Sequence, residues 1–206
     1  MISHKHKFIF IHIPKTGGNS IQTVLQPFSD DRKTVNDFQD GIHRFSIRGR
    51  YTPIKHATLD DYAAALDVSK FKLVACKRHP LDRLLSNYFS PNRWVSRARD
   101  GTLNIKSAFW NRELFLKWLI PPAVDYLKVE GVYRPPDFLF SFDSLETDFA
   151  AFVQEAEIPA GWTLPVLNAR EVASQEVELA RADPILAEIG VRHYREDFER
   201  FGFPLP

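Results

Sequence analysis

The sequence lacks the features that secreted domains and membrane proteins depend on. Cys76 is the only cysteine among 206 residues, which excludes an internal disulfide framework and indicates a reducing compartment. No apolar run approaches the roughly 18–20 residues that span a bilayer. The apolar stretch after the N-terminal MISHKHK reaches only from Phe8 to Ile13, too short for the apolar region of a signal peptide. These absences predict a cytoplasmic protein with no membrane span.

The charge balance excludes a second group of functions. The formal net charge is +1, from 27 basic and 26 acidic side chains, whereas binding nucleic acid over a whole surface requires a basic excess. We therefore expect no nucleic-acid partner. No cluster of His, Cys and Asp has the spacing of a metal site, and we expect His4 and His6 to lie in a disordered tail. The length suits one domain over residues 1–206.

The residues from Phe8 to Leu25 carry the most informative pattern. Phe8 to Ile13 is an apolar, largely β-branched run that predicts a strand buried on both faces. Pro14 ends it, a glycine turn follows, and Asn19 and Ser20 are good N-caps for a helix. A strand, a glycine turn and a helix N-terminus direct backbone N–H groups at an anion. The segment therefore predicts a P-loop-like cradle for phosphate or sulfate.

The order of residues in the cradle argues against an ordinary kinase or GTPase loop. In the ATP-binding P-loop the lysine follows the glycines, whereas here Lys15 precedes Gly17 and Gly18 in P-K-T-G-G-N-S. A tight turn without a ligand would also explain the glycines. The cradle alone therefore leaves both interpretations open.

A second strand–loop–helix segment follows. Phe71 to Cys76 is apolar and predicts a strand, and Pro80 suits the first turn of a helix. Arg78 lies directly after the strand, and Ser86 lies about two helical turns further on, off the apolar stripe. A guanidinium with a nearby hydroxyl suits a dianionic phosphate, although each residue alone could equally be an ordinary surface residue.

The rest of the chain completes an α/β pattern. Phe138 to Phe142 predicts a third strand, and helices are expected at about 59–67 after a capping signature, 105–119 and 145–156, with two more near 172–200. We expect residues 27–57 to form loops with one short helix. The aromatic residues between Arg93 and Lys117 are expected mainly to pack a helical face. Together these elements predict a three-layer α/β sandwich around a central, largely parallel sheet.

The two segments resemble the sulfotransferases that use 3′-phosphoadenosine 5′-phosphosulfate (PAPS), in particular the carbohydrate-type branch. P-K-T-G-G-N-S resembles the family's 5′-phosphosulfate loop, and R-H-P-L-D-R-L-L-S-N-Y resembles its 3′-phosphate segment. Weaker similarity extends through Leu164-Pro165 with Asn168 to the C-terminus. Ser141 and Asp143 depart from the pattern, since relatives often carry Arg and Glu there.

The resemblance implies a sulfotransferase that binds PAPS and moves its sulfuryl group to a hydroxyl acceptor, a saccharide by analogy with this branch. Arg78 and Ser86 would bind the 3′-phosphate, and His56 matches the place where relatives often carry a catalytic histidine. Lys15 would act in catalysis as well as binding, and no metal is implied. The 5′-phosphosulfate would lie against Lys15, Thr16, Gly17, Gly18, Asn19 and Ser20.

Two other functions stay open at this point. One is a nucleotide-dependent phosphotransferase, and the other is a non-catalytic relative that binds the nucleotide or a glycan. His56 could also be an ordinary loop histidine. We expect His12 to be a hydrogen-bonded core residue, His79 to serve packing and Cys76 to be inert.

Overall fold

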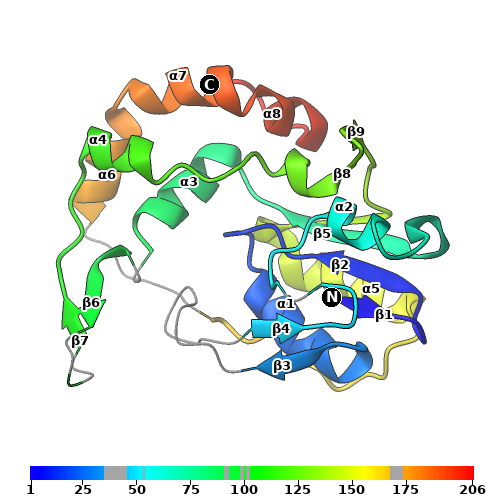
Figure 1. The fold of residues 1–206 in the computed structure, drawn as a ribbon. Helices are drawn as coiled ribbons and strands as arrows, with labels where there is room; N and C mark the ends of the chain where they lie inside the picture. The colour runs from blue at the N-terminus through cyan, green and yellow to red at the C-terminus, as the bar shows by residue number, and fades with distance from the viewer. Residues whose placement is uncertain (35–45, 53, 91–92, 98–99, 101–102, 168–173) are drawn as a thin grey trace. The chain divides into compact units, whose positions relative to one another are not determined.

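The structure is a computed structural model that describes residues 1–34, 46–52, 54–90, 93–97, 100, 103–167 and 174–206 (Figure 1). These residues form two compact units. The first takes in the described residues of Met1–Asn36, Phe45–Arg78 and Ala123–Leu167, and the second those of His79–Pro122 and Asn168–Pro206. The single domain expected over residues 1–206 stays a prediction.

A four-stranded sheet is the centre of the first unit. Its strands lie in the order β1 (Ile2–Ser3), β2 (Phe8–Ile11), β5 (Lys72–Lys77) and β10 (Phe138–Ser141). The last three are parallel, and β1 is antiparallel to β2. All four residues of β2 are buried, as the unbroken apolar run predicts. The structure therefore confirms a central, mostly parallel sheet and its three predicted strands.

The first residues of the chain differ from expectation. Ile2 pairs with Ile9 and Ser3 with Phe8, so this segment is an edge strand and the prediction of a disordered tail is wrong. His6 is held by a hydrogen bond of 2.8 Å between its Nδ1 and the carbonyl oxygen of Ala156. Because pairing with β2 satisfies backbone groups at the sheet edge, the short segment is ordered despite its charged side chains.

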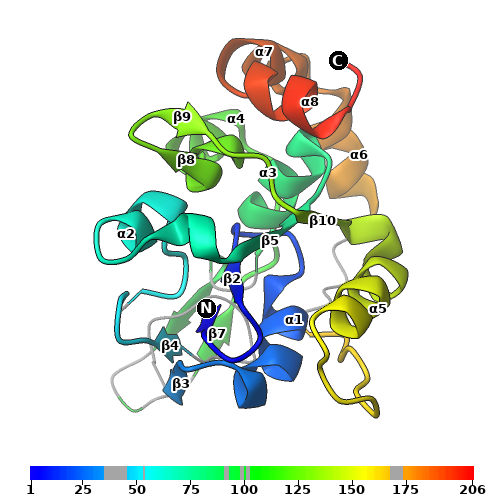
Figure 2. The same cartoon turned by 90° about the vertical axis from the view of Figure 1, so that its right-hand side faces the viewer.

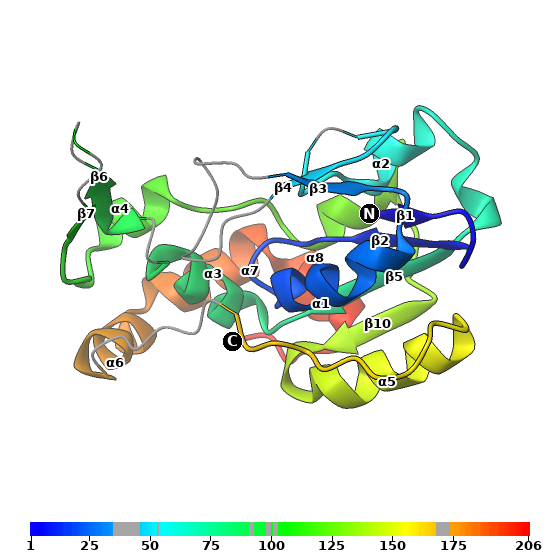
Figure 3. The same ribbon diagram turned by 90° about the horizontal axis from the view of Figure 1, so that it is seen from below.

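Helices cover both faces of this sheet. Figures 2 and 3 show α1 (Gly18–Leu25) and α5 (Leu145–Glu155) on one side and α2 (Leu59–Ala63) on the other. Alternate strand residues point toward α1 and α5, since side chains along a strand alternate between faces. The buried core on that side includes Phe8, Phe10, Val74, Cys76 and Phe140 from the strands and Ile21, Leu25, Phe149, Phe152 and Val153 from the helices.

The predicted capping signature before α2 is present. Thr58 accepts a hydrogen bond from the backbone N–H of Asp61, whose carboxylate accepts one from the N–H of Thr58. The helix is shorter than the predicted 59–67. Short elements complete the unit: η1 Gln26–Phe28, β3 Arg32–Thr34, β4 Ser46–Arg48, η2 Val68–Lys70, η4 Val124–Leu127, β8 Lys128–Val129, β9 Val132–Tyr133 and η5 Phe142–Ser144.

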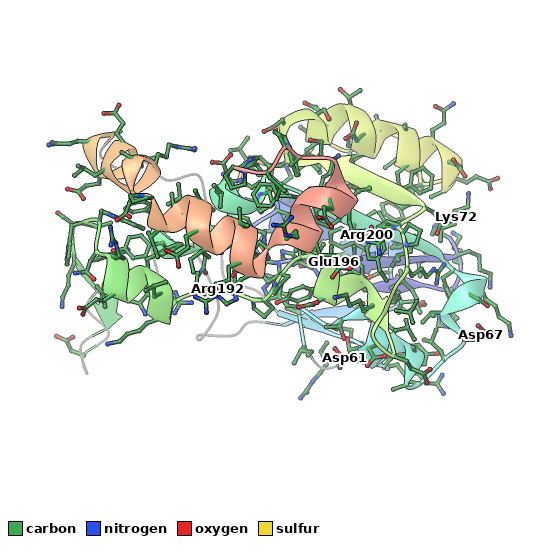
Figure 4. All side chains as sticks on the ribbon, turned by 90° about the horizontal axis from the view of Figure 1, so that it is seen from above. Asp61, Asp67, Lys72, Arg192, Glu196 and Arg200 are labelled. Atoms are coloured by element: carbon green, nitrogen blue, oxygen red, sulfur yellow. The ribbon has the colours of Figure 1, made fainter. Side chains whose placement is uncertain are left out.

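Helices make up most of the second unit. They are α3 (Pro80–Tyr88), α4 (Arg112–Lys117), α6 (Ser174–Ala182), α7 (Ile185–His193) and α8 (Arg195–Phe201), with a hairpin of β6 (Val95–Arg97) and β7 (Leu103–Ile105). The C-terminal part thus holds three helices where two were predicted. Figure 4 shows Glu196 and Arg200 side by side on α8, where they form an i, i+4 ion pair of 3.6 Å.

The prediction of a helix over 105–119 is wrong in its extent. The side chain of Asn111 accepts a hydrogen bond of 2.9 Å from the N–H of Leu114, and this cap begins α4 at Arg112. Residues 103–105 lie in β7 instead. An N-cap asparagine has non-helical backbone angles, so it separates the helix from the residues before it.

The aromatic residues of this region pack together, as predicted. The ring of Tyr88 contacts those of Trp94, Trp110, Phe115 and Trp118, with centroids 5.1–6.1 Å apart. The hydroxyl of Tyr88 donates a hydrogen bond of 2.6 Å to the carbonyl of Phe109. This cluster forms the core of the second unit together with residues from α6, α7 and α8.

Several predictions fall outside the described residues. Asn168 of the C-terminal similarity and residues 35–45 of the expected loop region belong to this group. None of the helices in the described part of the chain is both long enough and apolar enough to cross a membrane.

Candidate functional site

Three segments of the first unit end at one edge of the sheet. Because β2, β5 and β10 are parallel, their carboxyl ends share that edge. Lys15 follows β2, Arg78 follows β5 and Phe142 follows β10. Ligands of open α/β sheets bind outside the carboxyl ends of the strands, so this edge is the candidate site.

The loop between β2 and α1 has an unusual backbone. Lys15 has φ of 69° and Gly17 has φ of 87°, the left-handed region that side chains with a Cβ rarely adopt. Gly17 is the N-cap of α1, which begins at Gly18 with no side-chain cap. The expectation that Asn19 or Ser20 caps the helix is therefore wrong, because the helix begins before them.

Gly18 is required by a close contact with His12. A Cβ on Gly18 would lie 2.1 Å from Cδ2 of the His12 ring, closer than any carbon–carbon contact allows. The first turn of α1 can therefore approach the end of β2 only with glycine at this position. The strand end, the loop and the helix start are thus fixed to one another by packing.

Several side chains of the loop are buried or hydrogen-bonded within the unit. Thr16 is fully buried, and its hydroxyl donates a hydrogen bond of 2.9 Å to the carbonyl of Ile13. Ser20 is also buried. Asn19 has a buried Oδ1 with no hydrogen-bond partner among the residues that the structure describes. The hydroxyl proton of Thr16 is therefore already used within the loop.

Arg78 connects the second segment to the first. Its Nη1 donates a hydrogen bond of 3.3 Å to the carbonyl oxygen of Lys15. Its guanidinium carbon lies 4.1 Å from the centroid of the Phe142 ring, the geometry of a cation–π contact. Two residues that the sequence proposes for separate anionic groups thus meet at the same edge of the sheet.

Ser86 lies on α3 in the second unit. It is half-buried, while Leu84, Leu85 and Tyr88 are buried, so its predicted position off the buried stripe is confirmed. Pro80 begins α3 as predicted.

Other residues of the same segment stabilise the second unit. The side chain of Arg83 is fully buried, forms an ion pair of 3.7 Å with Asp197 and donates a hydrogen bond to the carbonyl of Pro121. The ring of His79 packs against Phe198 and Phe203, as its predicted packing role requires.

His56 lies beside the end of β2. Its Nδ1 is 2.8 Å from the carbonyl oxygen of His12, and the two imidazole rings have centroids 4.3 Å apart. Since a carbonyl only accepts hydrogen bonds, Nδ1 of His56 must carry the proton. A neutral His56 therefore has its basic lone pair on Nε2.

His12 is a hydrogen-bonded core residue, as predicted. Its Nδ1 lies 2.8 Å from Oε1 of Gln22, and both side chains are buried. Burial, followed by the positive charges of His56 and Lys55, holds the pKa of His12 well below its usual range. His12 is therefore neutral at pH 7 and adds no positive charge beside His56.

Cys76 does not belong to the chemistry of the site. It is fully buried within β5, and burial raises the pKa of its thiol to about 12, so the reactive thiolate is absent at neutral pH.

The described residues also contain no group of three or more His, Cys, Asp or Glu side chains placed to hold a metal ion.

Two parts of this arrangement were not predicted from the sequence. Phe142 contacts Arg78, and Gln22 holds the ring of His12. Phe142 was predicted as the last residue of the third strand, whereas β10 ends at Ser141. The carboxyl end of that strand could have indicated Phe142, since the residues after the first two strands had already been selected on that ground.

An α/β unit with cationic residues at the carboxyl edge of its sheet is a common scaffold for enzymes that bind phosphorylated nucleotides. A model of the sulfotransferase family matches residues 1–112, more than half of the chain, and the protein therefore belongs to the sulfotransferase family. Comparisons with curated proteins and with solved structures found no match.

Proposed function

We propose that this protein transfers a sulfuryl group from PAPS to a hydroxyl acceptor. The family supports sulfuryl transfer in general. The observation that carries the choice of donor is the hydrogen bond from Arg78 to the carbonyl of Lys15. It joins two cationic residues from successive strand ends, and PAPS carries two separate anionic groups for them to bind.

The loop after β2 fits the sulfated end of such a donor. Gly17 and Gly18 present backbone without side chains at the turn before α1. Lys15 supplies a positive charge for the bridging oxygen and the leaving phosphate. Backbone N–H groups of residues 17–19 supply hydrogen-bond donors, whereas the N–H of Ser20 donates to the carbonyl of Gly17. Arg78 and Ser86 bind the 3′-phosphate. Thr16 stabilises the loop through its hydrogen bond to the carbonyl of Ile13.

Bound PAPS supplies the activated sulfuryl group, whose bond to the leaving phosphate breaks as a new S–O bond forms. His56 takes the proton of the acceptor hydroxyl at Nε2, because its Nδ1–H is held by the carbonyl of His12. The neutral ring of His12 places no positive charge beside His56. No residue in this scheme requires a metal ion.

The acceptor and the cellular location remain predictions. The proposal of a saccharide acceptor rests on the resemblance to the carbohydrate-type branch. A cytoplasmic location rests on the composition, in particular the single cysteine.

A transfer assay with sulfate-labelled PAPS tests the proposal. The assay offers a panel of saccharide, phenol, lipid and peptide hydroxyls and measures label in the acceptor and release of adenosine 3′,5′-bisphosphate. We expect transfer to at least one saccharide, and at least about 100-fold slower transfer in a Lys15→Ala variant. Donor binding without transfer to any hydroxyl would instead support a non-catalytic role.

A further inference from the structure

Phe142 is a large aromatic residue that stays 37% exposed at the candidate site. It is the first residue after β10 and begins the short helix η5. The carboxylate of Asp148 fixes this turn, because it accepts hydrogen bonds of 2.7 Å from the N–H of Ser141 and 2.9 Å from the hydroxyl of Ser144. The backbone that carries Phe142 is thus held from both sides.

The ring of Phe142 contacts both anion-binding segments of the first unit. A Cβ on Gly17 would lie 3.3 Å from Cδ2 of Phe142, so the ring packs directly against the left-handed turn before α1. The same ring lies 4.1 Å from the guanidinium carbon of Arg78. One side chain therefore touches the turn of the first loop and the cation of the second.

These contacts restrict where the guanidinium of Arg78 lies. A free arginine side chain samples many rotamers, and fixing one of them on binding costs conformational entropy. A planar guanidinium over an aromatic face is held in orientation as well as position. The hydrogen bond to the carbonyl oxygen of Lys15 fixes the guanidinium at a second point, through one of its five N–H donors.

We propose that Phe142 is a positioning residue that holds Arg78 for recognition of the 3′-phosphate. This inference rests on the proposed function, since it assigns Phe142 to the donor site of that reaction. It also makes a specific claim: Phe142 acts through Arg78, so its effect depends on the presence of a 3′-phosphate in the ligand.

Calorimetric titration with two nucleotides tests this claim. Adenosine 3′,5′-bisphosphate carries the 3′-phosphate and adenosine 5′-monophosphate lacks it. We expect Phe142→Leu to weaken binding of the bisphosphate by about twofold to fivefold, the size of an exposed cation–π contact, and to leave binding of the monophosphate unchanged. Phe142→Tyr keeps the ring and should restore binding of the bisphosphate.

A double-mutant cycle with Arg78→Ala separates positioning from a general structural effect. In the Arg78→Ala background, Phe142→Leu should cause no further loss of affinity for the bisphosphate. Phe109→Leu is the matched control, because Phe109 is also an exposed phenylalanine but lies in the second unit. It should leave both affinities unchanged.

The outcomes distinguish failure of this inference from failure of the proposed function. The positioning role would be overturned by equal losses of affinity for both nucleotides, by additive losses in the cycle, or by no effect of Phe142→Leu. In each of these cases, binding of the bisphosphate by the wild-type protein would still support the proposed function. Normal binding by Arg78→Ala would also overturn it. A wild-type protein that binds neither nucleotide would contradict the proposed function, and this inference with it.

Discussion

The loops after β2 and β5 position positive charge in different ways. In the first, the backbone determines the geometry: Lys15 and Gly17 have positive φ, and Gly18 packs against the ring of His12. In the second, side-chain contacts determine it: Arg78 is held by the ring of Phe142 and by the carbonyl of Lys15. Substitutions in the first loop should therefore act on conformation and turnover, whereas those in the second should act on affinity.

The largest effects are expected on turnover, from Lys15 and His56. Lys15→Ala removes the charge proposed for the leaving phosphate, and loss of one such group costs about 10²–10³-fold in kcat. Lys15→Gln keeps most of the side-chain length but not the charge, so it should lose turnover as well. Steady-state sulfate transfer measures both variants, with Lys5→Ala as an exposed lysine control. A Lys15→Ala variant with wild-type turnover would remove the lysine from the mechanism.

His56→Ala should reduce kcat by about 10²–10⁴-fold, the usual contribution of a general base. Binding of adenosine 3′,5′-bisphosphate should stay unchanged, because the base is proposed to touch the acceptor. Rate and affinity measured on the same preparation give the required separation. An undiminished rate would identify His56 as an ordinary loop histidine, and an equal loss of affinity would make it a structural residue.

Arg78→Ala should weaken binding of adenosine 3′,5′-bisphosphate by about 10–100-fold, since hydrogen bonds to a charged group contribute about 1.5–3 kcal/mol. Arg78→Lys keeps the charge but not the planar fork, so it should recover only part of the affinity. Ser86→Ala removes a neutral hydrogen-bond donor, so it should weaken binding of the bisphosphate less than Arg78→Ala does. If Arg78→Ala lowers kcat without changing affinity, the distinction between the two loops is wrong.

Gly18→Ala should lower the free energy of unfolding by about 1–3 kcal/mol, the usual cost of overpacking. Because this cost comes from the contact with His12, the double variant His12→Ala/Gly18→Ala should lose less free energy of unfolding than the two single variants lose in sum. Denaturant unfolding measures all three variants. Strictly additive losses would show that the contact does not restrict position 18.

The smallest effect concerns pH. The pKa of His12 is lowered in the folded protein, whereas an unfolded histidine titrates near 6.5. As pH falls below 6.5, the unfolded chain takes up a proton that the folded protein does not, so folding stability falls by up to about 1.4 kcal/mol per pH unit. His12→Asn should reduce this slope between pH 6.5 and 5, and the exposed His193→Asn control should retain it. An unchanged slope in His12→Asn would assign the acid sensitivity elsewhere.

Local sequence patterns predicted most of the first unit. The apolar runs at Phe8, Phe71 and Phe138 became the parallel strands, and Thr58 with Asp61 became a capping box. These features depend on neighbouring residues, so they are visible in the sequence. The family match supports the assignment that the two motifs suggested.

Contacts between distant residues could not be predicted in the same way. The ring of Phe142 meets Gly17 and Arg78 only because β10 lies beside β5 in the sheet. The ordered N-terminus likewise depends on pairing with β2. Arg83 appeared in the nucleotide motif, yet its burial with Asp197 shows a structural role in the second unit. A motif therefore combines residues that bind with residues that support the fold.

The donor is the central claim, and a thermal-shift comparison tests it most directly. A ligand present at 100 times its Kd stabilises the folded state by about 2.7 kcal/mol. We predict that adenosine 3′,5′-bisphosphate raises the Tm of the wild-type protein and that ATP with magnesium raises it much less. A larger shift with magnesium–ATP would contradict the account and favour a phosphotransferase.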